Sequence, residues 1–290
     1  MGLGATLRLL ARQPPPGMSR EDAVLAGLVP PPGWQAPPRD RPLDLLRTAS
    51  ALIRMATRLA LTSTSTSTST STSTSTSTST STSTMPSTTT TEGLGYLRTF
   101  CRDLLTHLGI QVTIEDNAHG PHSGGVVYMW NQTSHLDHLV LPLAIPRPFH
   151  MTFNNEVRRT PLYGDYLART GHFWLDRTDE TQWRAALAAA AERIRAGAAV
   201  LVSPEGTRSW DGRLLPMKRG AFLLARTAAS PIVCLTVLGA RALLPRGRAG
   251  VRPGHIHIVL EPPIPVDAST SPDLEQLVTR TFEATLARAR

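Results

Sequence analysis

A strict alternation of threonine and serine from Thr62 to Thr84 limits what this chain can fold into. The tract has no apolar face to bury, so it cannot contribute to a packed core. Because more threonines follow it, we expect a disordered linker over residues 62–91, despite the preference of threonine for strands. The linker separates a proline-rich N-terminal segment, residues 1–61, from a folded domain, residues 92–290.

The end of the N-terminal segment, residues 42–61, has the pattern of a basic amphipathic helix. Arg47, Arg54 and Arg58 line one side of the helical wheel. The apolar residues on the opposite side are Leu45, Ala49, Leu52, Met55, Ala56 and Leu59. Such a helix can lie on an anionic bilayer with its apolar side in the headgroup boundary. It can equally dock on a core and leave its arginines in solvent, and the pattern does not separate these two interpretations.

Strands and helices alternate throughout residues 92–290. Apolar runs at residues 126–130 and 199–202 indicate buried strands, whereas periodic stretches such as residues 92–108 and 181–196 indicate helices. A further helix is expected over residues 157–169. This alternation predicts an α/β fold in which helices cover the faces of a sheet.

The charge balance favours an anionic partner. The chain has 30 Lys and Arg against 22 Asp and Glu, a formal net charge of +8. A phosphorylated substrate, an acidic membrane surface and nucleic acid would all suit this charge. The cationic residues are dispersed and few aromatic side chains could stack on bases, so we expect no nucleic-acid partner.

Cysteine usage and hydropathy exclude several other classes of protein. Cys101 and Cys234 are too few for a disulfide scaffold, and no Cys/His cluster has the spacing of a metal site, so we expect no metal and an intracellular location. No apolar stretch reaches the roughly 18 residues of a membrane-spanning helix. A secretory signal is not apparent either.

The turn after the apolar run 199–202 is the first candidate site. It contains Glu205, Gly206, Thr207 and Arg208. Ligands of α/β proteins collect where strands end, and a guanidinium matches two phosphate oxygens while a glycine lets the backbone approach them. Taken alone, the stretch is equally compatible with an ordinary polar turn.

The stretch Asn131–His138 is the second candidate, because it also leaves a strand and enters a helix. Ser134 is expected to cap the helix, with Asp137 at its third position. His135 and His138 are one helical turn apart. A capping role for the aspartate and a surface or packing role for the histidines compete with a catalytic one.

Four blocks within residues 124–247 resemble, in order and spacing, those of the glycerolipid acyltransferases. The blocks are Asn131–Asp137, Gly171–Arg177, Pro204–Ser209 with its continuation Lys218–Phe222, and Ser230–Val233 followed by Gly239. The resemblance implies a mixed sheet flanked by helices and a reaction without a cofactor. Acyl-CoA or acyl carrier protein would serve as co-substrate, and a lysophospholipid or glycerol phosphate as acceptor.

The resemblance also implies roles for single residues. Arg208 and Arg177 would hold the acceptor's phosphate, within a substrate site that includes Glu205, Gly206 and Thr207. Asp137 would orient the catalytic base. The family's base is a histidine at position 132, where this chain has Gln132, and glutamine has no basic nitrogen. His135 is the nearest replacement, and His138 the second.

Two hypotheses follow from this resemblance. The first is an acyltransferase of phospholipid synthesis that lies peripherally on the cytoplasmic face of a membrane. The second is a catalytically weak or inactive protein of the same fold that binds lysophospholipid or acyl donor, which Gln132 favours.

Overall fold

A computed structural model of the chain describes residues 17–26, 28–64, 88–119, 124–154, 171–175, 179–267 and 273–289. Most of the expected linker, the expected helix over residues 157–169 and Arg177 lie outside these residues. The described helices are α2 (Arg20–Leu25), α3 (Pro42–Thr64), α4 (Thr91–His107), α5 (Asp137–Ala144), α7 (Glu180–Arg195), α8 (Arg219–Ala228), α9 (Ala240–Leu243) and α10 (Leu274–Arg288). The described strands are β1 (Ile110–Asp116), β2 (Val126–Trp130), β3 (Phe149–Asn154), β4 (Phe173–Leu175), β5 (Ala199–Val202), β6 (Ile232–Leu238) and β7 (Gly254–Leu260).

The described strands form one seven-stranded mixed sheet in the order β1-β7-β6-β2-β5-β3-β4. All neighbouring strands pair in parallel except β6 and β7, which are antiparallel. The central strands β2 and β5 are buried along their whole length, as their continuous apolar sequences predict. The expected mixed sheet flanked by helices is therefore confirmed.

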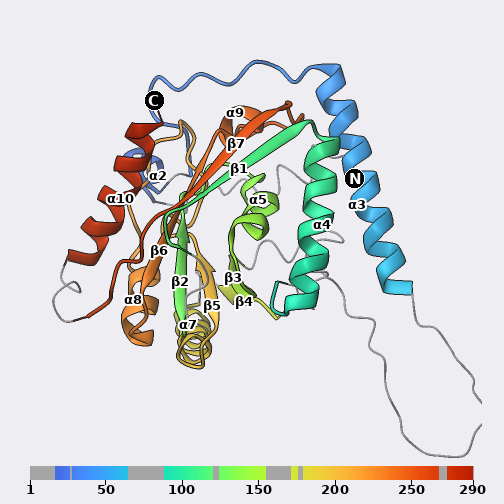
Figure 1. The fold of residues 1–290 in the computed structure, drawn as a ribbon. Helices are drawn as coiled ribbons and strands as arrows, with labels where there is room; N and C mark the ends of the chain where they lie inside the picture. The colour runs from blue at the N-terminus through green and yellow to red at the C-terminus, as the bar shows by residue number, and fades with distance from the viewer. Residues whose placement is uncertain are drawn as a thin grey trace, which may run out of the picture.

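Helices cover both faces of the sheet (Figure 1), and one apolar core lies under each set of helices. On one face, α4 and α5 pack over side chains such as Tyr128 and Leu201. On the other face, α7, α8 and α10 cover the alternate side chains, including Met129 and Val200. This alternation along β2 and β5 is the two-residue period of a strand.

Helix α3 lies outside α4, on the side away from the sheet (Figure 1). It docks through Asp44, Thr48 and Ala51, which are all buried. The Thr48 hydroxyl accepts a hydrogen bond from the Val251 amide at 2.8 Å, and Ser50 contacts the His107 ring. The docked side is thus partly polar, and it is not the side that the sequence pattern marked as apolar.

Most of the described apolar side chains of α3 consequently face solvent, Ala51 and the half-buried Leu52 excepted. Leu46 is 65% and Ile53 is 66% exposed, and Leu43, Leu45 and Ala49 are exposed as well. None of the helices in the described part of the chain is long and apolar enough to cross a bilayer.

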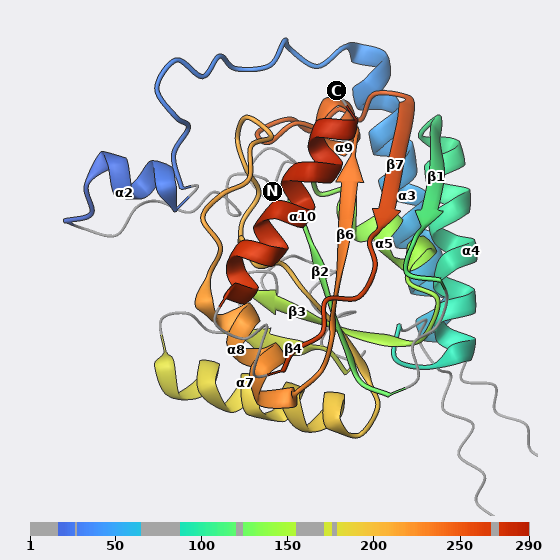
Figure 2. The ribbon, with the colours of Figure 1, turned by 60° about the vertical axis from the view of Figure 1, so that its left-hand side comes forward.

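The segment between α2 and α3 passes over one end of the sheet, close to α9 (Figure 2). We call its described residues 28–41 the strap. Trp34 of the strap donates a hydrogen bond from its indole to the carbonyl of Trp210 at 3.1 Å. At the far end of the strap, Asp40 accepts a hydrogen bond from the Ala249 amide at 3.2 Å.

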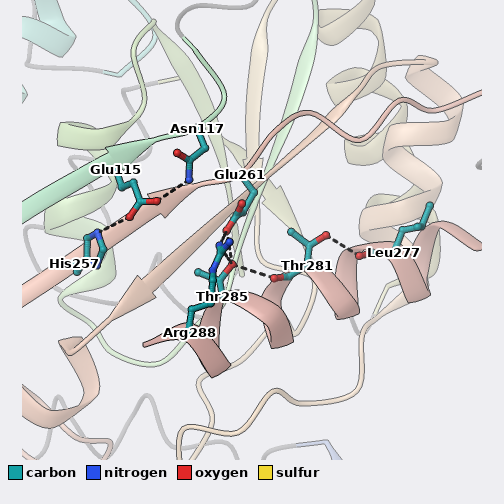
Figure 3. A network of polar contacts seen from close by, with 8 residues as sticks. All are labelled: Glu115, Asn117, His257, Glu261, Leu277, Thr281, Thr285 and Arg288. Atoms are coloured by element: carbon teal, nitrogen blue, oxygen red, sulfur yellow. Dashed lines mark hydrogen bonds and ion pairs between the residues drawn. The ribbon is translucent and has the colours of Figure 1, made fainter. Parts of the chain in front are cut away.

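A buried carboxylate fixes the C-terminal helix to the end of β7 (Figure 3). Glu261 accepts hydrogen bonds from the Thr285 hydroxyl and from the guanidinium of Arg288, both on α10. On the neighbouring strands, Glu115 pairs with His257 at 3.5 Å. The Glu261 contacts lie just past the end of β7 and fix α10 there, whereas His257 lies at the middle of the strand.

Candidate acceptor-phosphate site

The two sequence blocks with the most polar residues meet at one edge of the sheet. The loop 131–136 follows β2, and the loop 203–218 follows β5. Because β2 and β5 are parallel neighbours, both loops leave the sheet at the same edge. The carbonyl of Gln132 accepts a hydrogen bond from the Ser209 amide at 3.1 Å and so joins the loops directly.

Asn131 completes the sheet rather than facing a ligand. Its side-chain amide donates to the Val237 carbonyl at 3.1 Å, and its side-chain oxygen accepts from the Val237 amide at 2.7 Å. Asn131 is almost fully buried. This pair of bonds ties the start of the first loop to β6.

Asp137 is fully buried and closes a turn in front of α5. Its Oδ2 accepts hydrogen bonds from the amides of Thr133 and Ser134 at 2.9 and 3.1 Å. Burial raises the pKa of this carboxyl to about 7, although the two amides, Arg208 and the indole of Trp130 act in the opposite direction. Its Oδ1 has no hydrogen bond of normal geometry.

The expected cap at Ser134 is wrong. Helix α5 begins at Asp137, and Leu136 stands at its cap position. The Ser134 hydroxyl instead donates to the Leu244 carbonyl at 2.9 Å and accepts from the Leu136 amide at 3.2 Å. The physical reason is that the Asp137 carboxylate bonds backwards to the preceding amides and holds residues 133–136 in a turn.

Glu205 is also buried, and both of its oxygens hold backbone. Oε1 accepts from the Gln132 amide at 2.8 Å and Oε2 from the Leu215 amide at 2.7 Å. Burial raises the pKa of Glu205 to about 8, the two amides lower it, and the nearby Asp137 raises it further. The side chain of Glu205 therefore holds the loop 131–136 and the later part of the loop 203–218 in place.

The remaining residues of the second block follow a tight turn. Gly206 has φ of +67°, a left-handed conformation that suits glycine, and its amide donates to the Ser203 hydroxyl at 3.2 Å. Thr207 is half-buried. Burial lowers the pKa of Arg208 to about 10, which leaves it charged at neutral pH, and Asp137 opposes this shift.

Both candidate histidines lie close to Arg208. Burial lowers the pKa of His135 well below its ordinary value, and the charges of Arg208, His138 and Arg246 lower it further. Burial and Arg208 lower the pKa of His138 to about 4. Both imidazoles are consequently neutral at pH 7.

His138 lies between aromatic rings. Its ring centroid is 6.1 Å from that of Trp130 and 5.7 Å from that of Phe153. Its buried Nδ1 has no hydrogen-bond partner among the described residues. His135 precedes α5 and is half-buried.

The arrangement combines a half-buried guanidinium with an unprotonated imidazole. A guanidinium binds a phosphate through paired hydrogen bonds, and a neutral imidazole can accept a proton from a hydroxyl group. Of the predicted site residues, Gln132, His135, Asp137, Glu205, Gly206, Thr207 and Arg208 are brought together, whereas Arg177 lies outside the described residues. In the described ranges, no group of three His, Cys, Asp or Glu side chains could hold a metal ion.

Comparison with known proteins identifies the domain. Residues 110–238 match the family model described as Acyltransferase. A 1-acyl-sn-glycerol-3-phosphate acyltransferase of Chlamydomonas reinhardtii is 35% identical over 141 residues, which cover 48% of this chain and 42% of that protein. Residues 110–238 are thus similar to the glycerolipid acyltransferases.

A second relative and a solved structure show similarity of the sequence and of the fold, respectively. A chloroplastic 1-acyl-sn-glycerol-3-phosphate acyltransferase of Brassica napus is 32% identical over 139 residues, 48% of this chain and 40% of that protein. The crystal structure of the 1-acyl-sn-glycerophosphate acyltransferase PlsC from Thermotoga maritima shares the acyltransferase fold. It matches with a TM-score of 0.61 and 19% identity, over 84% of this chain and 95% of that one. The matches to the two relatives from algae and plants span less than half of their length.

Two residues next to the candidate site, Arg246 and Trp210, were not predicted from the sequence. The guanidinium of Arg246, which is 6% exposed, donates to the Arg208 carbonyl at 2.7 Å. It also lies 4.1 Å from the centre of the Trp210 ring. Neither residue belongs to one of the four blocks, and no periodicity or motif in the sequence marks Arg246.

Proposed function

We propose that this protein transfers a fatty acyl group from acyl-CoA or acyl carrier protein to a lysophospholipid or glycerol phosphate in phospholipid synthesis. The match of residues 110–238 to the acyltransferase family model supports the reaction class. The observation that carries the proposal is that the loops of His135 and Arg208 are joined by the hydrogen bond between Gln132 and Ser209. The charge of the half-buried Arg208 therefore acts on the imidazole of His135 and helps to keep it unprotonated. Phosphate binding and proton removal are the two tasks that an acceptor with a phosphate and a hydroxyl requires.

The proposed reaction is direct transfer. An imidazole removes the proton of the acceptor hydroxyl, the oxygen attacks the thioester carbonyl, and the carbon–sulfur bond breaks so that the carrier leaves as a thiol. Arg208 holds the acceptor phosphate, with Arg177 as a proposed second contact. We assign the base to His135, because it lies nearer to Gln132 in the loop than His138 does. No metal or cofactor takes part in this proposal.

A second function, binding without turnover, is favoured by a specific observation. Gln132 stands at the family's base position, and the described hydrogen bonds of Asp137 go to the amides of Thr133 and Ser134. No imidazole is held by that carboxylate among the described contacts. A protein with this geometry would still bind lysophospholipid or acyl donor through Arg208.

The proposal that the protein binds a membrane is based on the exposed side of α3. Its docked side is partly polar, and its exposed side carries Leu46 and Ile53 in the neighbourhood of arginines such as Arg54. We propose that this side lies on an anionic bilayer, at the cytoplasmic face, where lysophospholipid acceptors are found. The two cysteines, both buried and free, agree with a reducing compartment.

The decisive experiment assays the purified full chain with lysophosphatidate, glycerol 3-phosphate and a zwitterionic lysophospholipid, each with acyl-CoA and with acyl carrier protein as donor. We expect transfer to at least one phosphate-bearing acceptor. Binding of lysophosphatidate without turnover would establish the second function instead. A protein that neither binds nor acylates any acceptor would contradict both.

A further inference from the structure

Trp210 lies two residues after Arg208 and is held by side chains from two distant parts of the chain, the strap and the region of α9. Its carbonyl accepts hydrogen bonds from the indole of Trp34 at 3.1 Å and from Nε and Nη2 of Arg241 at 3.1 and 3.0 Å. Trp34 belongs to the strap, and Arg241 to α9. The backbone at Trp210 is therefore fixed by contacts that are distant in sequence.

The ring of Trp210 also has side-chain contacts, with Trp34 and with Arg246. The ring of Trp34 meets it edge-on, with centroids 5.1 Å apart and planes at 72°. The guanidinium of Arg246 lies over the same ring at 4.1 Å, which is within the range of a cation–π contact. We call Trp34, Trp210, Arg241 and Arg246 the Trp210 anchor.

The Trp210 anchor is connected directly to the residue that we assign to the acceptor phosphate. Arg246 donates from Nη1 to the Arg208 carbonyl at 2.7 Å. The intervening residue, Ser209, is fully buried and donates its amide to the Gln132 carbonyl. The backbone of residues 208–210 is thus held from both sides, by the first loop and by the Trp210 anchor.

The loop 203–218 needs such support because it contains no helix or strand. Gly206 and Gly212 have φ of +67° and +87°, so the chain turns sharply on either side of Arg208. Glu205 fixes the loop before Arg208 through the Gln132 and Leu215 amides. A binding group on a loop is precise only when its neighbours lock it, and the Trp210 anchor supplies that lock after Arg208.

We propose that Trp34 and Arg246 are positioning residues of the acceptor-phosphate site, acting through Trp210 on the backbone that carries Arg208. Both residues lie outside the span that matches the acyltransferase family model. The strap, which connects α2 to α3 (Figure 2), therefore also helps to position Arg208. This inference rests on the proposed function of Arg208.

The test measures Trp34→Ala and Arg246→Ala in the full chain, with glycerol 3-phosphate or a short-chain lysophosphatidate as a water-soluble acceptor. A soluble acceptor removes any effect of membrane recruitment. We expect the KM for the acceptor to rise roughly 10-fold to 100-fold, the scale on which misplacement of a binding group acts, while the KM for the donor stays the same. Trp34→Phe, which keeps a ring but loses the N–H donor, should fall between Trp34→Ala and the natural protein.

Two matched controls accompany these variants. Arg248→Ala removes the same charge from the loop that carries Arg246, and Leu25→Ala truncates an exposed side chain in the same N-terminal region as Trp34. Both should keep the natural KM for the acceptor. An unchanged acceptor KM in Trp34→Ala and Arg246→Ala would overturn the inference. An equal rise of both KM values together with a lower melting temperature would also overturn it, since that pattern reports general loss of structure.

A readout without substrate separates this inference from the proposed function. If the natural protein neither turns over nor binds inorganic phosphate or lysophosphatidate, the proposed function fails. Hydrogen exchange at the Ser209 amide then decides whether the Trp210 anchor fixes this segment. Faster exchange in Trp34→Ala and Arg246→Ala than in Arg248→Ala supports the anchor, and equal exchange in all three rules it out.

Discussion

The carboxylate of Glu205 accepts a hydrogen bond from the backbone amide of Gln132 at 2.8 Å, although 73 positions separate the two residues. This bond joins the loops after two parallel strands, and the second carboxylate oxygen holds Leu215 further along the chain. A residue in the middle of a motif typical of phosphate binding is therefore engaged with backbone. Its charge state affects both the stability of the fold and the position of the loops.

We expect the stability of the protein to fall as pH rises from about 4.5 to about 8. Burial raises the pKa of Glu205 from 4.5 to about 8, so the unfolded chain releases this proton at a lower pH than the folded chain does. Asp137, whose pKa is raised from 3.8 to about 7, acts in the same direction. Urea denaturation at several pH values measures this slope.

Glu205→Gln is expected to flatten that slope. Glutamine keeps one acceptor oxygen but turns an NH₂ group towards the other backbone amide, which should cost about 1–3 kcal/mol of unfolding free energy. Asp211→Asn, a similar change at a half-buried residue of the same loop, serves as the control. A slope that is the same in Glu205→Gln and in the natural protein would show that Glu205 does not titrate in this range.

Arg208→Ala is expected to weaken lysophosphatidate binding by about 1.5–3 kcal/mol, the contribution of a hydrogen bond to a charged group. Arg208→Lys should recover only part of this loss, because lysine cannot form the paired contact. Calorimetric titration measures both. Arg213→Ala, whose exposed side chain lies in the same loop, should bind normally, and equal affinity in all variants would remove Arg208 from the site.

The second function, binding without turnover, predicts that Gln132→His raises the rate of acyl transfer by about 10²–10⁴-fold, because it restores a base at the family's position. Asp137→Asn in the same background should abolish the gain, because the carboxylate would no longer orient the imidazole. Rates with saturating acyl donor measure both. A fast natural enzyme that His135→Ala silences and Gln132→His leaves unchanged would instead exclude the second function and support the assignment of the base to His135.

Substitution of the exposed apolar side chains of α3 is expected to release the protein from anionic vesicles. Leu46→Glu and Ile53→Glu should each cost about 1.5 kcal/mol or more of partition free energy, a roughly tenfold loss of binding. Vesicle sedimentation at two salt concentrations measures this, and higher salt should release part of the natural protein as well. Leu223→Glu, on the opposite face of the sheet, is the matched control, and similar binding of all variants would mean that another surface meets the lipid.

Strand positions were predictable wherever an apolar run had clear limits. Residues 126–130 and 199–202 form strands with the expected bounds, because continuous apolar sequence suits central strands buried on both faces. Helix limits such as Thr91–His107 and Glu180–Arg195 differ from the expected ones by one residue. The short α9 was missed, since four residues are too few to show a period.

Only those parts of the site that lie within the sequence motifs were predictable. The blocks around Asp137 and Arg208 identified the two loops, but the backward bonds of the Asp137 carboxylate and the polar docked side of α3 depend on partners elsewhere. The contact between Trp34 and Trp210 spans 176 positions, and no local pattern announces it. Such contacts arise from the packing of the finished fold, where side chains without a motif become neighbours.

The pairing of β1 with β7 affects how the chain acquires its structure on the ribosome. Thr113 of β1 contacts His255 of β7, 142 positions later in the chain. During synthesis, β1 and α4 must therefore wait for β7 to emerge before that edge of the sheet can close. Contacts of such long range slow folding and leave strand edges open to other chains in the meantime. The nascent protein is thus most exposed to aggregation before its last strand has been made.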